Sequence, residues 1–182
     1  MTETSERFRR VAAAFTERVD AVPADGWDRP SPGPDWTAKD IVFHLSQTAA
    51  TFLGRVGVEL PAAATQTDDP VAAWTAARDT VQTTLDDPAI ATREYDSPMG
   101  KTTFEKSIGM YGVGDVLVHT WDLARAVGLD EHLDPDEAQR LFTLLEPNDE
   151  MMRKGTSFGP KVEVPDDADP QTKLLAFTGR HP

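Results

Sequence analysis

The sequence predicts an all-α protein whose main part is a bundle of four long helices. Apolar residues recur at three- and four-residue spacing in four long segments, which is the period of a helix with one buried face. Capping residues precede the second, third and fourth segments. The end of the fourth segment, residues 114–128, has no wide polar face, so neighbouring helices must cover it on most sides. Together these observations favour a helical bundle.

The four long helices are separated by connections that the sequence also marks. We expect the helices at residues 4–22, 37–53, 70–85 and 103–128. Residues 23–36 are rich in proline and glycine and form an irregular connection, in which Trp27 and Trp36 are expected to pin the loop to the core. Residues 61–69 are expected to form a loop, and residues 95–100 a turn between short extended pieces.

Two shorter helices follow the bundle. One begins after Asp134 and ends near Pro147, and the last carries Leu174, Leu175 and Phe177. The sequence therefore predicts a single domain over residues 1–182, in which residues 150–182 form a packed, largely irregular tail with an extra C-terminal helix.

The composition limits the partners of this 182-residue chain. Its hydrophobic content of 39% and regular periodicity argue against disorder. A net charge of −13 repels nucleic acid and anionic membrane surfaces, so neither is an expected partner. No apolar run is long enough to span a bilayer, and the polar, acidic N-terminus is unlike a secretory signal. We therefore expect a cytoplasmic protein.

The absence of cysteine limits the metal chemistry. It excludes disulfides, thiolate ligands and a cysteine nucleophile. A bound metal would need imidazole and carboxylate ligands, which suit zinc, nickel, iron or manganese. The chain has four histidines, His44, His119, His132 and His181, and the last two are expected to be solvated.

Asp115 and His119 interrupt the apolar surface of residues 114–128. They are four residues apart, so a helix places them on one face, one turn apart. A buried carboxylate and imidazole need a partner, because an unpaired polar group in a core is unfavourable. That partner is each other, a third side chain or a metal ion, and the spacing alone leaves all three open.

His44 lies on the apolar stripe of the second predicted helix and is expected to point inward. With Asp115 and His119 it would form an open three-ligand site, the arrangement of a catalytic zinc. A satisfied core histidine is the competing interpretation. Asp122 has two interpretations as well: a surface ion pair with Arg125, or a group that orients one of the histidines.

Several segments resemble a known family. Asp35–Leu45 resembles the second-helix motif of the mycothiol-dependent maleylpyruvate isomerase N-terminal-domain family, which is related to the DinB-like helical bundles. Asp115–Ala126 resembles the fourth-helix motif of the same family. The tail is similar to an actinobacterial subgroup of uncharacterised members at Phe158–Pro160, Val162–Pro165 and Leu174–Arg180.

The resemblance implies a DinB-like four-helix bundle with a divalent metal, usually zinc, held by two histidines and a carboxylate. The matching positions are His44, Asp115 and His119. The isomerase has glutamate where this chain has Asp115, which is one methylene shorter. The isomerase also has a C-terminal domain that helps to form its active site and that these 182 residues do not contain. The resemblance thus supports the fold and the metal better than the isomerase reaction.

Two functions follow as hypotheses. The first is a metal-dependent thiol transferase or isomerase that acts on a small molecule with mycothiol, whose pKa the metal would lower. A hydrolase would use the same ligands. The second is a non-catalytic helical module that binds a metal, a small ligand or a partner chain, with Asp115 and His119 as a structural pair. No general base stands out. Because DinB-like proteins are often dimers, the resemblance also implies a homodimer.

Overall fold

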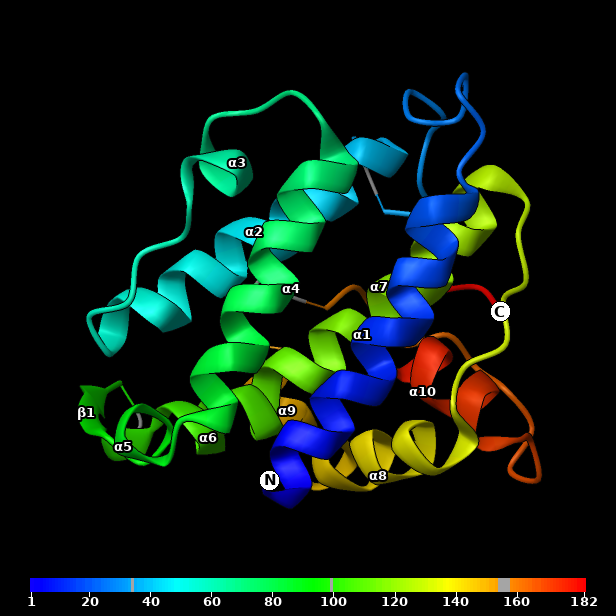
Figure 1. The fold of residues 1–182 in the computed structure, drawn as a ribbon. Helices are drawn as coiled ribbons and strands as arrows, with labels where there is room; N and C mark the ends of the chain where they lie inside the picture. The colour runs from blue at the N-terminus through cyan, green and yellow to red at the C-terminus, as the bar shows by residue number, and fades with distance from the viewer. Residues whose placement is uncertain (34, 99, 154–157) are drawn as a thin grey trace. The chain divides into compact units, whose positions relative to one another are not determined.

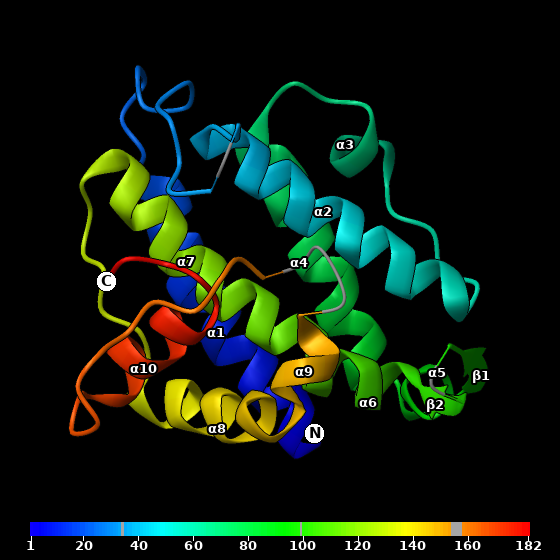
Figure 2. The same cartoon turned by 180° about the vertical axis from the view of Figure 1, so that it is seen from behind.

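The computed structural model describes residues 1–33, 35–98, 100–153 and 158–182, which form two compact units, residues 1–130 and 131–182. The first unit is a bundle of four long helices: α1 (Glu3–Ala21), α2 (Ala38–Arg55), α4 (Pro70–Asp86) and α7 (Val113–Val127). Helices α4 and α7 each pack against both α1 and α2. Figure 1 shows α1 and α4 toward the viewer, and Figure 2 shows α2 and α7 from behind. The predicted all-α, DinB-like fold is confirmed.

The short elements of this unit lie between the long helices. They are α3 (Ala62–Thr65), α5 (Pro88–Ala91), β1 (Glu94–Ser97) and β2 (Gly100–Thr103). The two strands pair antiparallel, with Glu94 opposite Thr103. The predicted extended pieces are therefore confirmed, although Met99 in the predicted turn lies outside the described residues. The sequence missed α3 and α5, because single-turn helices have no apolar period to detect.

Capping side chains fix where the long helices begin. Thr2, Asp69 and Thr103 each accept a hydrogen bond from a backbone N–H of the helix that follows. Asp69 precedes a first-turn proline, whose missing N–H leaves no donor unsatisfied there. At the start of α2, the Thr37 backbone N–H donates to the Asp40 carboxylate over 2.8 Å, and the Thr37 hydroxyl donates to the same oxygen. The predicted starts of these helices are thus confirmed.

The bundle core is apolar and contains aromatic contacts between α1 and α4. The Phe15 and Trp74 rings pack edge to face with their centroids 4.6 Å apart. The Trp74 indole N–H donates to the Thr16 hydroxyl over 2.8 Å, so this buried ring leaves no polar atom unpaired. Burial of each such large side chain stabilises the fold by about 1.5–3 kcal/mol.

The fourth predicted helix is continuous but not uniform. It consists of α6 (Phe104–Ser107), a π-helical turn η1 (Ile108–Gly112) and α7, and it ends at Gly128, whose φ of +79° suits glycine. A Cβ on Gly109 would lie 3.0 Å from the Thr4 hydroxyl of α1, so glycine allows this turn to approach α1 closely. The sequence shows Gly109, but its apolar pattern predicted an uninterrupted α-helix through this turn. Each extra residue in a turn rotates the following face by about 100°.

The second unit contains α8 (Pro135–Leu145), the 3-10 turn η2 (Glu146–Asn148), α9 (Asp149–Met152) and α10 (Pro170–Phe177). Helix α10 packs on α8, and the Phe142 and Phe177 rings meet edge to face. Both predicted C-terminal helices are therefore confirmed. Residues 154–157 of the predicted tail lie outside the described residues, and the single-domain organisation stays a prediction.

No helix in the described part of the chain combines the length and apolar character that a bilayer-spanning segment needs.

The cap of α2 can be tested by substitution. Thr37→Ala removes the hydroxyl that binds Asp40, and we expect it to lower the free energy of unfolding by about 1 kcal/mol. Thr37→Ser keeps the hydroxyl and should remain close to the wild type. Urea denaturation followed by circular dichroism measures both variants. Equal stability of the two variants would show that this cap does not stabilise α2.

Candidate metal centre

Helices α2 and α7 bring the three predicted ligands together. His44 lies on α2, and Asp115 and His119 lie one turn apart on α7. Each residue offers one ligand atom, and the three atoms lie within 4.8 Å of one another. Among the described residues this is the one cluster of acidic and imidazole groups with such spacing. The other two histidines, His132 and His181, are exposed, as predicted.

The hydrogen bonds within this cluster are long, and their lengths also match the separations between ligand atoms around a shared cation. The Asp115 carboxylate lies 3.3 Å from His44 Nε2 and 3.4 Å from His119 Nε2. Charge-assisted hydrogen bonds are usually about 2.7–2.9 Å long. In a tetrahedral zinc site with bonds of about 2.0–2.1 Å, neighbouring ligand atoms are roughly 3.3–3.4 Å apart. The donor set and its spacing therefore fit a zinc-like ion.

Asp122 holds His119 in the orientation that such a site needs. Its carboxylate lies 2.8 Å from His119 Nδ1, and its side chain is only 3% exposed. A hydrogen bond from Nδ1–H leaves Nε2, which faces Asp115, as the atom that a metal would bind in place of a proton. Of the two interpretations of Asp122, the orienting role fits this geometry, and the surface position is wrong because the residue is buried.

Burial and the neighbouring groups have opposite effects on the pKa values of Asp115 and His119. Burial raises the pKa of Asp115, but hydrogen bonds from His119 and His44 outweigh it and hold that pKa below its ordinary value. Burial lowers the pKa of His119, but hydrogen bonds to Asp115 and Asp122 outweigh it and raise that pKa to about 9. His119 lies between two carboxylates. They would stabilise a bound cation in the same way as they stabilise the proton on its ring.

Trp36 covers the cluster from the loop before α2. Its ring centroid lies 4.9 Å from that of His44 and 5.7 Å from that of His119. The sequence predicted that this indole pins the loop, but it did not place the ring on two candidate ligands. The sequence did contain an indication that Trp36 lies near His44, because Trp36 directly precedes the cap of the helix that carries His44.

Backbone bonds hold that loop in place. The Ser31 N–H donates to the Trp36 carbonyl over 2.8 Å, and the N–H groups of Ala38 and Lys39 donate to carbonyls of the same loop. These bonds satisfy donors in the first turn of α2 that have no partner within the helix. Asp35 has a φ of +62°, a left-handed conformation that aspartate tolerates better than most residues. The position of Trp36 is thus set by the backbone.

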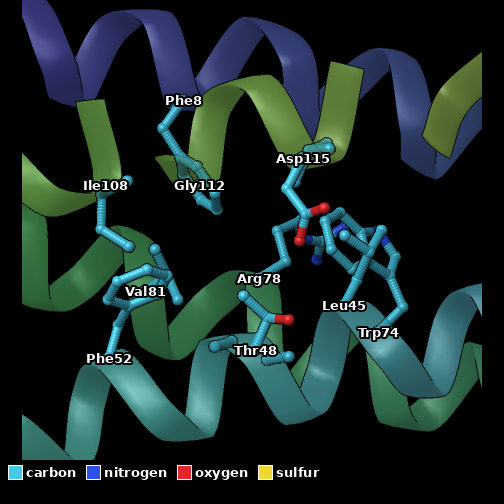
Figure 3. A pocket seen from close by; sticks show the side chains of 13 residues that line it. Phe8, Leu45, Thr48, Phe52, Trp74, Arg78, Val81, Ile108, Gly112 and Asp115 are labelled. Carbon is cyan, nitrogen blue, oxygen red and sulfur yellow. The ribbon is translucent and has the colours of Figure 1, made fainter. Parts of the chain in front are cut away.

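A pocket lies beside the cluster inside the bundle (Figure 3). Its wall is mostly apolar and includes Phe8, Phe52 and Trp74. Asp115 belongs to both the wall and the cluster, so a molecule in this pocket could reach the candidate metal position. The pocket supplies the apolar surroundings and the few polar groups that are typical of small-molecule sites.

Comparison with known proteins identifies the family. Residues 8–124 match the mycothiol maleylpyruvate isomerase N-terminal domain. The chain belongs to this family. The matched residues include all of the candidate ligands together with Trp36 and Asp122.

Curated relatives extend over nearly the whole chain. Uncharacterized proteins from two strains of Mycobacterium tuberculosis, CDC 1551 / Oshkosh and ATCC 25618 / H37Rv, are each 31% identical to it over 179 residues. The match covers 94% of this chain and 94% of each relative. No solved structure matches significantly.

The raised pKa of His119 leads to a pH prediction for the protein after chelation of metal. Because its folded-state pKa of about 9 exceeds the unfolded value of about 6.5, its contribution to stability is complete below the lower value. That contribution is lost as the pH rises through about 9. Asp122→Asn should move the His119 pKa down toward its ordinary value. Titration of the imidazole signals by NMR measures this shift.

The exposed Asp20 on α1 provides a matched control. Asp20→Asn removes the same charge away from the cluster and should leave the His119 titration unchanged. If Asp122→Asn also leaves it unchanged, the Asp122 carboxylate does not hold the imidazole in solution.

Proposed function

We propose that this protein binds a divalent metal, preferably zinc, through His44, Asp115 and His119, and that it is a thiol-dependent transferase or isomerase that acts on a small molecule. The observation that carries the proposal is the separation of 3.3–3.4 Å between the Asp115 carboxylate and the two imidazoles. Nickel, iron and manganese accept the same ligands, but zinc is favoured because both separations between Asp115 and an imidazole match a tetrahedral site. Membership of the mycothiol-related family supports mycothiol as the thiol.

The residues around the site have distinct tasks in this proposal. A cation held there supplies positive charge that lowers the pKa of a thiol or water molecule beside it. Asp122 fixes the tautomer and the ring plane of His119 through the bond at Nδ1. Trp36 lies over both imidazoles and restricts the access of water from the loop side. The pocket beside Asp115 holds the body of the substrate.

A non-catalytic module is the second candidate. It is favoured by the fact that every buried side-chain polar atom among the described residues has a hydrogen-bond partner without a cation. In that case Asp115 bridges two imidazoles as a structural element, and the fold needs no metal. That the protein is a cytoplasmic homodimer stays a prediction from the sequence.

Metal analysis distinguishes the two candidates. We expect the purified protein, after equilibration with zinc and desalting, to retain about one zinc ion per chain, because three ligand atoms lie within 4.8 Å of one another. His44→Ala and His119→Ala should each lose it, since two ligands hold zinc weakly. Elemental analysis by mass spectrometry gives the stoichiometry.

His132→Ala is the control, because His132 is an exposed histidine outside the cluster, and it should retain the zinc. A zinc-free wild type that His119→Ala merely destabilises would support the structural module instead.

The thiol part of the proposal predicts proton release. Mycothiol binding to the zinc-loaded protein near pH 7 should release about one proton, because the cation favours the thiolate. Calorimetric titration in two buffers with different ionisation enthalpies measures that proton. S-methylated mycothiol has no thiol proton to release, and it should bind more weakly. If both compounds bind equally well and neither releases a proton, the thiol does not meet the metal.

A further inference from the structure

The pocket beside the cluster of His44, Asp115 and His119 is lined by one cationic side chain, Arg78 of α4. It falls on the inward stripe of that helix, because it follows Trp74 by four residues and precedes Val81 by three, and both of these are buried. Its own side chain is 27% exposed, which places the guanidinium at the edge of the pocket rather than in open solvent. In a chain with a net charge of −13, Arg78 is the group on this mostly apolar wall that could attract an anion, whereas Asp115 is the acidic group there.

Hydrogen bonds hold the Arg78 guanidinium in place but do not use all of its N–H donors. Arg78 Nη1 donates to the Thr16 hydroxyl over 3.1 Å, and Nε donates to Asp79 over 2.8 Å. Within the part of the chain that the structure describes, Nη2 has no hydrogen-bond partner. Asp79 is 62% exposed, so solvent screens its charge. Arg78 therefore keeps N–H donors for a ligand while Thr16 fixes the group.

Thr48 adds a second unpaired polar group to the same wall. It lies one turn after His44 on α2 and lines the pocket. On the same helix, Ser46 and Thr51 each donate their hydroxyl proton to the carbonyl four residues earlier. No such bond, and no other partner among the described residues, is found for the Thr48 hydroxyl. It is left to a molecule inside the pocket.

Arg78 and Asp115 do not neutralise each other across the pocket. Asp115 pairs with His44 and His119, whereas Arg78 pairs with Asp79. Figure 3 shows Arg78, Thr48 and Asp115 around the pocket, on three different helices. A ligand in this pocket would meet the Arg78 guanidinium, the Thr48 hydroxyl and Asp115, with Phe52, Trp74 and Val81 on the apolar part of the wall.

We propose that this pocket binds the carboxylate of a short-chain carboxylic acid, and that Arg78 anchors this carboxylate with help from the Thr48 hydroxyl. A guanidinium matches a carboxylate in geometry as well as charge. The position of the reactive group, at the end near Asp115, rests on the proposed function, because only a metal there would act on it. The carboxylate anchor itself does not depend on the metal.

Acetate and acetamide are the probes, since they are small enough for this narrow pocket and differ only in the charged end group. By ligand-observed NMR titration of the full-length protein, acetate should bind about tenfold more tightly than acetamide, as expected of a hydrogen bond to a charged group. Arg78→Met should abolish that preference, Arg78→Lys should keep part of it, and Thr48→Val should reduce it. Arg55→Met, which removes an exposed arginine from α2, should bind like the wild type.

The outcomes separate this inference from the proposed function. Equal binding of the two probes by the wild type, or no binding of either, overturns the carboxylate anchor. An Arg78→Met variant that keeps the preference overturns it as well. If Arg78→Met does not fold, as judged by its thermal melt, Arg78→Lys and Thr48→Val decide the result. Zinc content is measured on each variant: retention of zinc with no preference rejects the anchor alone, whereas preference without zinc binding rejects only the metal.

Discussion

The placement of one carboxylate between two imidazoles is the constraint on which the rest of this site depends. Asp115 on α7 faces His44 on α2, so the two helices must pack with these residues at the same level. Ile41 on α2 and Leu117 on α7 are buried in the apolar core of the same bundle. Since an unpaired charge in such surroundings is unfavourable, the apolar packing and the polar cluster require each other. A helix displaced by one turn would leave both unsatisfied.

The cluster is supported from two sides by groups that do not belong to it. Asp122 fixes His119 from within the same helix, and Trp36 covers both imidazoles from the preceding loop. The backbone bonds of that loop also satisfy the first turn of α2. The start of α2, the position of the indole and the orientation of His44 are therefore consequences of one local structure. Such supporting contacts are usual around metal ligands and limit how far they can relax.

Charge is distributed unevenly in this acidic protein. The cluster and the pocket concentrate the imidazoles of His44 and His119 and the guanidinium of Arg78 inside the bundle. The π-helical turn directly before α7 sets the phase of Asp115 relative to Ile108, and both residues line the pocket. Turns of this kind are frequent at functional sites, because they reorient a helix face without ending the helix. The fold thus brings imidazole, guanidinium and carboxylate groups together within one part of the bundle.

The sequence alone determined the all-α fold, most helix starts and the three candidate ligands, because helical periodicity and capping are local and because four histidines leave few choices. The i, i+4 spacing of Asp115 and His119 placed them on one face, but it could not show which residue faces them. Only the tertiary structure brought His44 to within 3.3 Å of Asp115 and Trp36 onto both imidazoles. It also turned Arg78 toward the pocket. These contacts join residues distant in the chain, and packing between helices decides them.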